Sequence, residues 1–263
     1  MEGVKERKIA PVNFLMEPSS LANQAQLFKL LRDKEGQPYS DAELKKLPYV
    51  PKNHPQQSEW KHRTRSLKRF LKYIHDNPRL KTVLEVGCGN GWFTYYMASA
   101  IAVNETGAKV TAMDIDQSLL ERAAKVFARP NLEFVLGDVM QAPLPEKHFD
   151  LIVLNGSIQF LPPLHVLMPH LLKLLAPKGE IHIMDSPFYR KANLNNREKQ
   201  TESYFKGLGL SEITTHYQHH TYEDLKQFSY KLLYNPRRKR NFVQQLALLK
   251  PAPYPWIRIV QSS

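Results

Sequence analysis

Cysteine, glycine and long apolar runs are all scarce in this sequence. Cys88 is the only cysteine among 263 residues, so an intramolecular disulfide is excluded, and one thiol among scattered histidines lacks the ligand spacing of a zinc site. The longest apolar stretches, such as 151–161, are far shorter than the roughly 20 residues of a membrane helix. The first residues also lack the apolar segment of a secretory signal. We therefore expect a cytoplasmic protein without a metal and without membrane insertion.

The composition is that of a folded chain. Hydrophobic residues make up 42% of the sequence and charged residues 24%, values that exclude a disordered, collagen-like or coiled-coil protein. The length fits one α/β or all-β domain that carries extensions.

The net charge of +12 is distributed unevenly. Residues 1–80 carry 16 basic and 9 acidic side chains, residues 81–185 carry 8 and 11, and residues 186–263 carry 13 and 5. The basic excess therefore belongs to the two flanks and not to the centre. Such an excess points to an anionic partner of the flanks.

The centre shows strands and helices in alternation. Short apolar runs rich in β-branched residues predict strands at 82–87, 109–114, 132–138, 149–156 and 180–185. Longer stretches predict helices at 58–76, 92–102, 117–128 and 164–176. Because short loops cannot join parallel neighbours, this alternation predicts a parallel sheet with crossover helices. Ligands of such sheets bind beyond the carboxyl ends of the strands.

Three of the eleven glycines fall within five residues of each other, at the end of the first predicted strand. Gly87, Gly89 and Gly91 stand in VLEVGCGNGWFT at 83–94. Glycine lets the backbone turn sharply and lets a ligand lie against it. The spacing differs from the G-x-G-x-x-G of dinucleotide binders. A tight structural turn is the alternative, but the position between strand and helix favours a ligand site.

Acidic residues end the second and third predicted strands. Asp114 ends the second strand, where a carboxylate can accept hydrogen bonds from both hydroxyls of a ribose. Asp114 or Asp116 could instead cap the following helix, and both roles fit the sequence MDID. Asp138 follows the third strand, where it could accept from an adenine amine while Val139 packs on the ring. A solvated loop acid is the alternative for Asp138.

The segments VLEVGCGNGWFT, VTAMDID, FVLGDV and FDLIVLNGSIQFL, in this order and spacing, resemble the class I S-adenosylmethionine-dependent methyltransferases across roughly residues 80–186. The resemblance implies a Rossmann-like, mostly parallel sheet of about seven strands with helices on both faces. It implies S-adenosyl-L-methionine as cofactor and S-adenosyl-L-homocysteine as product. By this resemblance the cofactor contacts fall on Glu85, Gly87, Cys88, Gly89, Gly91, Asp114, Ile115, Asp138, Val139 and Asn155.

We expect two parts in the chain. Residues 1–80 form a helical extension that serves as a lid, and residues 81–263 form the methyltransferase domain. Within that domain the cofactor core is 81–186 and the substrate side is 187–263. Since an in-line displacement needs mainly alignment of the reactants, a catalytic residue need not be visible in the sequence.

Several polar and aromatic residues are candidates for the substrate side or the lid. Trp60 and Arg63 lie on the helix at 58–76, where they could place an aromatic wall and a cation near the methionine carboxylate. Packing or solvation of that helix is the alternative. The other candidates are Gln159, Asp185, Tyr189 and the cluster THYQHHTYEDL at 215–225, which contains His219. Placement on the surface is the alternative for any one of these histidines.

The residues argue against two acceptors and leave others open. Adenine amino methylation in this family commonly uses Asn/Asp-Pro-Pro-aromatic where this chain has Asn155-Gly156-Ser157-Ile158. Methylation of pyrimidine C5 needs a cysteine nucleophile, but Cys88 lies inside the glycine loop. A small-molecule acceptor is the first hypothesis. An RNA or tRNA methyltransferase that binds through the basic flanks, including the run at 237–240, is the second. A non-catalytic module that binds the cofactor and a partner protein is the third.

Overall fold

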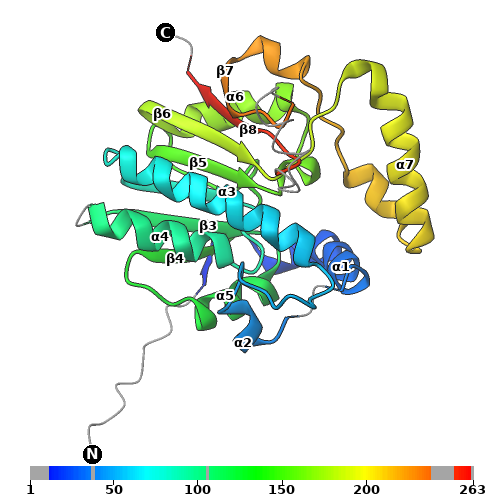
Figure 1. Cartoon of the computed structure of the whole chain (residues 1–263). Coiled ribbons are helices and arrows are strands. Elements are labelled where there is room, and N and C mark those ends of the chain that lie inside the picture. The colour runs from blue at the N-terminus through cyan, green and yellow to red at the C-terminus, as the bar shows by residue number, and fades with distance from the viewer. Residues whose placement is uncertain (1–11, 37–38, 105–106, 238–251, 262–263) are drawn as a thin grey trace, which may run out of the picture.

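A single mostly parallel sheet organises the chain, with the strand order β1-β4-β3-β2-β5-β6-β8-β7 (Figure 1). The computed structural model describes residues 12–36, 39–104, 107–237 and 252–261. Its strands are β1 Asn13–Phe14, β2 Thr82–Val86, β3 Lys109–Asp114, β4 Leu132–Leu136, β5 Phe149–Asn155, β6 Leu175–Met184, β7 Ser229–Tyr234 and β8 Trp256–Val260. Among these strands the antiparallel pairs are β6–β8 and β8–β7. The predicted α/β fold class is confirmed.

The five strands predicted from the sequence are present, and one of them begins earlier than expected. The predicted helix at 164–176 ends at Leu174, because β6 starts at Leu175. Leu175 pairs with Phe149 ahead of an irregularity in the β5–β6 register, so sheet pairing overrides the helical pattern there. The sequence did not locate β1, β7 or β8.

Helices cover both faces of the sheet. They are α1 Pro18–Lys34, α2 Asp41–Leu44, α3 Gln57–Asp76, α4 Trp92–Asn104, α5 Gln117–Val126, α6 Leu164–Leu174 and α7 Leu194–Gly207. Val83 packs into the cluster that contains α3, α4 and α5, while the next residue, Leu84, packs into the cluster that contains α6. This alternation is the period of two that a strand buried on both faces requires.

In the described part of the chain, no helix combines the length and the apolar composition that crossing a membrane requires. Four short 3₁₀ helices complete this part: η1 Ile158–Phe160, η2 Lys191–Asn193, η3 Ser211–His216 and η4 Asp224–Gln227.

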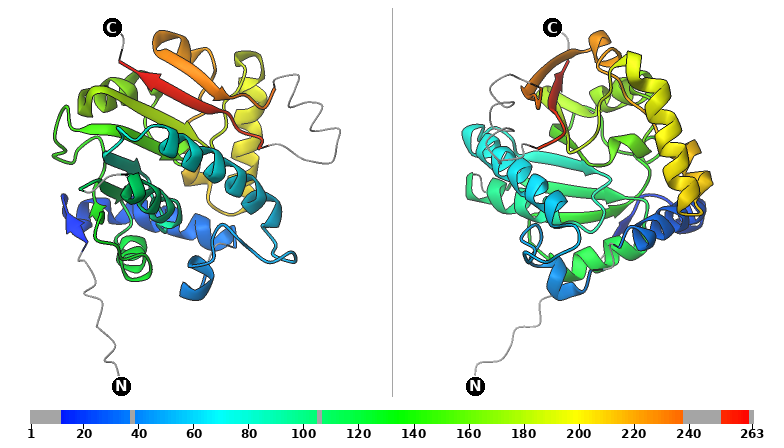
Figure 2. Two further views of the ribbon diagram at one scale, coloured as in Figure 1. Left: turned by 60° about the vertical axis from the view of Figure 1, so that its left-hand side comes forward. Right: turned by 45° about the vertical axis from the view of Figure 1, so that its right-hand side comes forward.

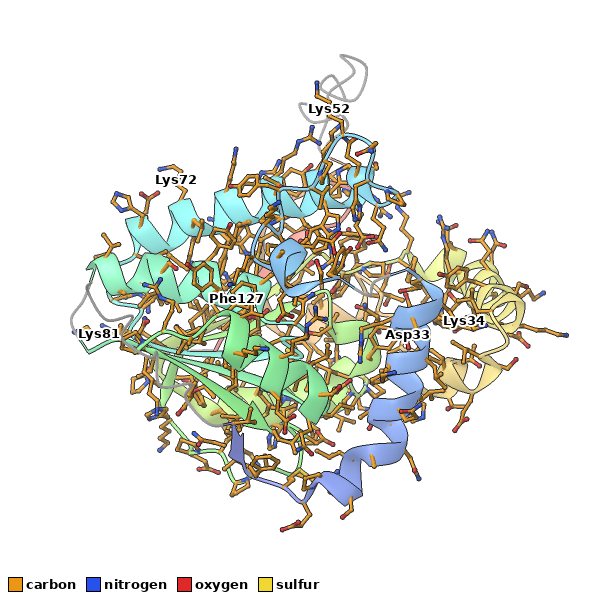
Figure 3. All side chains as sticks on the ribbon, turned by 90° about the horizontal axis from the view of Figure 1, so that it is seen from below. Asp33, Lys34, Lys52, Lys72, Lys81 and Phe127 are labelled. Carbon is orange, nitrogen blue, oxygen red and sulfur yellow. The ribbon has the colours of Figure 1, made fainter. Side chains whose placement is uncertain are left out.

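The two flanks of the sequence meet beyond the carboxyl ends of the strands. Leu27 and Leu31 of α1 form an apolar cluster with Phe205 of α7 and with Ile213 of η3. Figure 2 shows α1 and α7 side by side at this edge, and in Figure 3 Asp33 and Lys34 mark the end of α1 beside α7. Segments far apart in sequence therefore cover the same strand ends.

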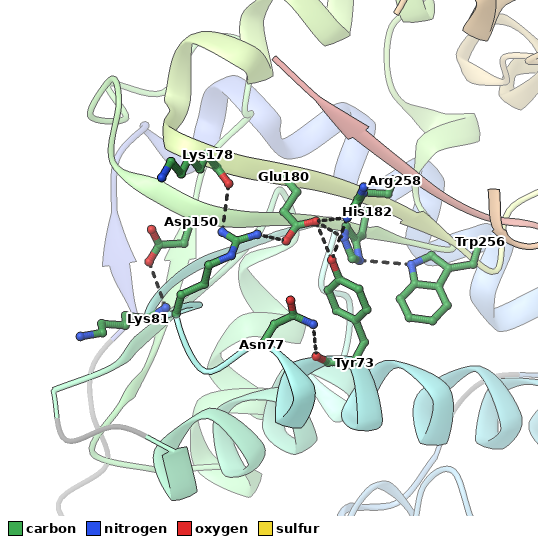
Figure 4. Close-up of polar contacts among 10 residues, drawn as sticks. Tyr73, Asn77, Lys81, Asp150, Lys178, Glu180, His182, Trp256 and Arg258 are labelled. Carbon is green, nitrogen blue, oxygen red and sulfur yellow. Dashed lines mark hydrogen bonds and ion pairs between the residues drawn. The ribbon is translucent and has the colours of Figure 1, made fainter. Parts of the chain in front are cut away.

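A buried polar network holds α3 over β6 (Figure 4). The carboxylate of Glu180 on β6 accepts a hydrogen bond of 2.6 Å from the Tyr73 hydroxyl of α3, and it pairs with Arg79 and Arg258. His182 accepts from the indole N–H of Trp256 at its Nδ1, 3.1 Å away. Its Nε2 therefore carries the proton and faces Glu180 at 3.3 Å. Both oxygens of this buried carboxylate are satisfied.

Candidate active site

A cavity of about 1940 Å³ opens at the carboxyl ends of β2, β3, β4, β5 and β6. The loops after these strands form its floor, and α1, the first turns of α3, α7 and residues 253–255 form its walls. This is the edge where ligands of parallel sheets bind. A volume above the usual range of roughly 300–1,000 Å³ for small-ligand pockets leaves room for a cofactor together with a second molecule.

The glycine loop forms part of the floor, and its backbone requires glycine. Gly87 has a φ of +73°, and a Cβ there would lie 2.6 Å from the Cβ of Ser157. Gly89 has a φ of +54°, and no atom lies within 4 Å of the place where its Cβ would be. Both residues line the cavity. Gly87 therefore serves the packing of the loop, while Gly89 leaves its backbone open to a ligand.

Asp114 is fixed in place by the loop that it faces. Its Oδ2 accepts from the backbone N–H of Gly89 at 2.8 Å, and its Oδ1 accepts from the backbone N–H of Asp116 at 3.0 Å. Burial raises the pKa of Asp114, and these two hydrogen bonds oppose the rise. Asp116 caps α5, because its side chain accepts from the N–H of Leu119. The capping role suggested for Asp116 is therefore observed, while the ribose contact of Asp114 stays a prediction.

Burial shifts the pKa of two further groups under the loop toward their uncharged forms. Burial raises the pKa of Glu85 to about 8, although the hydrogen bond with Thr94 opposes the rise. Burial also raises the pKa of the Cys88 thiol, as do the nearby carboxyl groups of Asp114 and Glu85. A thiol in this environment is not a nucleophile, since the thiolate is the reactive form.

The predicted adenine-side residues follow β4. Asp138 accepts from the backbone N–H of Met140 at 2.9 Å and from the side-chain amide of Gln141 at 3.0 Å. Val139 is buried beside it, and both line the cavity, as does Ile115 after β3. The strand tips therefore present their side chains to one space.

The exits of β5 and β6 lie side by side on the same floor. Asn155 pairs with Met184, and the N–H of Gly156 donates to the carbonyl of Met184 at 2.9 Å. Asp185 follows directly, with a φ of +45°. Burial raises the pKa of Asp185, while the charge of Arg63 and a hydrogen bond from Ser66 oppose the rise.

The cavity brings together most of the residues predicted from the sequence. Its lining includes Trp60, Arg63, Glu85, Gly87, Cys88, Gly89, Asp114, Ile115, Asp138, Val139, Asn155, Gln159 and Tyr189. Gly91 and His219 are not among the lining residues. A Cβ at Gly91 would lie 2.9 Å from the Phe134 ring, so this glycine permits helix–strand packing. His219 is hydrogen-bonded with Thr201 at 2.8 Å, and its ring packs at a tilt of 56° on the ring of Tyr217, 4.8 Å between centroids.

The outer part of the cavity is aromatic, and the sequence did not predict most of it. Phe28 of α1 packs on Phe160 at 5.1 Å between ring centroids, and Phe160 packs on Tyr217 at 5.5 Å. Phe205 and Tyr204 of α7 also line it. Tyr204 donates to Glu35 beyond the end of α1 at 2.9 Å. These rings come from both flanks of the sequence, so no single segment predicts that they meet.

Comparisons with known proteins agree with this geometry. Residues 83–179 match a family model described as a methyltransferase domain. Malonyl-[acyl-carrier protein] O-methyltransferase of Priestia megaterium is 27% identical over 144 residues, which are 50% of this chain and 51% of that protein. Trans-aconitate 2-methyltransferase of Escherichia coli is 33% identical over 135 residues, 51% of each chain. This chain therefore spans about half the length of the curated relatives that it matches.

Among solved structures, the YcgJ protein of Bacillus subtilis aligns with a TM-score of 0.55 at 13% identity, over 76% of this chain and 100% of that one. At this identity the likeness concerns the fold alone. The family match shows a methyltransferase domain at residues 83–179, and the strand order and the glycine loop agree with the resemblance to the class I S-adenosylmethionine-dependent methyltransferases. The family resemblance noted in the sequence is confirmed.

Proposed function

We propose that this chain is a methyltransferase that binds S-adenosylmethionine on the floor of the cavity and methylates a small anionic acceptor. The main support for this proposal is the contact between Asp114 and the glycine loop. It places a carboxylate beside a stretch of backbone that no side chain of the described residues covers. When bound, the cofactor supplies an electrophilic methyl group together with its own leaving group.

The residues of the floor fit that cofactor. Gly89 leaves space where any side chain would intrude, and Asp114, although bonded to two amides, keeps lone pairs for the ribose hydroxyls. Asp138 and Val139 offer an acceptor and an apolar contact to the adenine. Glu85 is mostly protonated near neutral pH, so it adds little negative charge beneath the loop. The floor thus binds and orients without needing a metal.

Arginines at the cavity wall support an anionic acceptor. Arg190, Arg197 and Arg237 line the cavity, and none of them pairs with a carboxylate in the described part of the chain. Arg197 lies over the ring of Tyr189 and Arg237 lies 5.0 Å over the ring of Tyr222. Such guanidinium groups are suited to a carboxylate or a phosphate.

The other arginines that line the cavity already form ion pairs with carboxylates. Arg32, Arg63 and Arg122 pair with Asp116, Glu59 and Asp41, respectively. The anion-binding capacity therefore lies on the side formed by residues 190–237. Trans-aconitate, in the name of one relative, is itself a carboxylate anion, and we extend that chemical class to this chain as part of the proposal.

Contacts across the outer side of the cavity favour a small molecule over a nucleic acid. Contacts between α1 and α7 narrow the outer side of the cavity, and we propose that residues 1–80 act there as a lid. Residues 238–240 of the predicted phosphate-binding run lie outside the described residues. The RNA hypothesis, like the non-catalytic one, stays a prediction without a supporting contact.

Titration calorimetry with S-adenosylmethionine and S-adenosylhomocysteine tests the proposal. We expect both to bind and Asp114→Asn to weaken binding at least tenfold, which corresponds to about 1.4 kcal/mol, because the amide removes the acceptor that faces Gly89. Asp76→Asn is the matched control, since Asp76 pairs only with exposed Lys72 on the outer side of α3. Absence of binding heat with either compound would contradict the proposed function.

A further inference from the structure

Three oxygens at the exits of β5 and β6 lack hydrogen-bond donors. They are Oδ1 of Asn155, Oε1 of Gln159 and Oδ2 of Asp185, each shielded from solvent. All three residues line the cavity. An unsatisfied buried oxygen costs roughly 1–3 kcal/mol, so three of them in one place call for a functional explanation.

The rest of the side chain is already fixed in Gln159 and in Asp185. The amide nitrogen of Gln159 donates to the carbonyl of Gly156 at 2.8 Å, which sets the orientation of the amide and leaves its oxygen as the free group. Oδ1 of Asp185 accepts from Ser66 of α3 at 2.6 Å, which leaves Oδ2 as the free group. For Gln159 and Asp185 the missing partners are therefore donors and not acceptors.

Asp185 also holds a backbone conformation that few residues adopt. Its φ of +45° lies in the left-handed region, which is disfavoured for residues with a Cβ but tolerated by Asp and Asn. Gly156 on the neighbouring strand exit also has a positive φ, +71°. Strain of this kind concentrates where a side chain must be held in place for a ligand.

The charged groups around Asp185 are Glu59, Arg63 and Arg69 of α3. Two tyrosines complete its surroundings, Tyr254 ahead of β8 and Tyr234 of β7. Arg63 lies close to the strand exits, with Nη1 3.8 Å from the Cβ position of Gly156. Because Arg63 is engaged by Glu59 at 2.6 Å, its positive charge is partly compensated there.

We propose that Asn155, Gln159 and Asp185 receive the nucleophilic group of the acceptor, that this group is an amine or a hydroxyl, and that Asp185 takes its proton. This inference rests on the proposed function. The N–H or O–H bond breaks, the proton goes to Oδ2, and the electron pair stays on the acceptor atom to form the bond to the methyl carbon. The methyl–sulfur bond breaks in the same exchange, and its electron pair remains on sulfur.

A carboxylate nucleophile does not fit this place. It carries no hydrogen, so it would set two further acceptor oxygens against the three unsatisfied ones and add a second negative charge beside Asp185. Like charges at short range disfavour each other strongly where water is excluded. We instead expect the anionic part of the acceptor to contact Arg190, Arg197 and Arg237, in the side of the cavity wall that residues 190–237 form. The acceptor class is therefore an amine or alcohol that also bears an acidic group.

The chemical class of the methylated product tests this assignment. The protein is incubated with S-adenosylmethionine carrying a ¹³C methyl group and a panel of amines, hydroxyl compounds and simple carboxylic acids that all bear an anionic group. We expect N-methyl or ether O-methyl carbons that survive mild base. A base-labile ester methyl, an S-methyl or a C-methyl would overturn the inference and leave the proposed function standing. Binding of the cofactor without any labelled product would overturn both.

Asp185→Asn tests the role of the carboxylate, because Asn also tolerates the left-handed backbone. We expect at least a hundredfold loss of kcat/KM on the acceptor found above, within the range of general-base effects. The wild-type pH profile should rise as Asp185 ionises, and the variant should lack that limb. Binding of S-adenosylhomocysteine, measured by calorimetry, should stay within threefold. An unchanged pH profile, or an equal loss in the exposed α7 variant Glu198→Gln, would overturn the inference.

Discussion

Glu180 lies inside β6 and Asp185 directly follows it, yet the structure surrounds these two carboxyl groups in opposite ways. Glu180 faces Tyr73, Arg79, His182 and Arg258, so both of its oxygens are satisfied. Asp185 has a donor on one oxygen only. Burial acts on both, but the hydrogen bonds and charges around Glu180 lower its pKa to about 2, whereas the pKa of Asp185 is raised.

The difference separates a structural site from a reactive one. A buried carboxylate with a complete set of donors holds its neighbours together, here α3, β6 and β8. A buried carboxylate with an incomplete set costs stability, and it is retained where a ligand completes the set. The same strand therefore stabilises the fold in its interior and serves the cavity at its end.

The largest expected effect follows from removing the charge of Glu180. Glu180→Gln leaves Arg79 and Arg258 without their buried partner, and breaking a buried pair costs about 3–5 kcal/mol. We expect a loss of this size in the free energy of unfolding, measured by urea titration with circular dichroism.

An exposed ion pair on α3 serves as the control for that measurement. Asp76→Asn removes a partner of Lys72, whose side chain is 75% exposed, and surface pairs of this kind contribute about 0–1 kcal/mol. Equal losses in the two variants would contradict a structural role for the Glu180 network.

The next effect is the pH dependence of the same network. The pKa of Glu180 falls from its usual 4.5 to about 2 in the folded chain, so the stabilisation is complete above pH 4.5 and is lost as the pH falls toward 2. Because Arg79 and Arg258 are 47% and 32% exposed, solvent screens part of this interaction, and we expect a contribution below the ~3 kcal/mol that the full shift would give. We expect the stability difference between wild type and Glu180→Gln to shrink over that range. A stability difference between wild type and Glu180→Gln that stays constant down to pH 2 would contradict the structural role of the Glu180 carboxylate.

The smallest effect is expected at Asp185. Because its pKa is raised in the folded chain, ionisation of Asp185 costs stability as the pH rises above the usual aspartate range. Asp185→Asn removes that cost and keeps an oxygen for Ser66. We expect stability at neutral pH that equals the wild type or exceeds it by up to about 1 kcal/mol. A loss above about 2 kcal/mol in thermal or urea unfolding would make Asp185 a structural residue instead.

The sequence predicted the floor of the cavity because local patterns determine it. A strand that ends in clustered glycines, followed by strands that end in Asp114 and Asp138, is visible in single segments of the chain. Trp60 lines the cavity but is also buried in the core, where its indole donates to Tyr39, so its role beside the cofactor stays a prediction. Such features depend on residues that are neighbours in sequence.

The rest depends on partners that are distant in sequence. EIHIMD at 180–185 predicts a buried strand, but nothing in it shows that Glu180 meets Tyr73 and Arg79. The aromatic wall joins Phe28 to Phe160 and Tyr217 only after α1 and α7 fold over the strand ends. The burial of His220 also depends on a distant partner. Its Nε2 is hydrogen-bonded with the carbonyl of Ile158, 2.9 Å away. Predicting these contacts requires the tertiary fold.

The most direct test is the rate of methyl transfer from S-adenosylmethionine per folded molecule, measured for wild type, Glu180→Gln and Asp185→Asn under conditions where all three are folded. We predict that Glu180→Gln stays within threefold of wild type and that Asp185→Asn falls at least a hundredfold, in line with the loss of a general base. Equal rates for wild type and Asp185→Asn, or a greater loss in Glu180→Gln, would contradict the separation of structural and reactive carboxyl groups on β6.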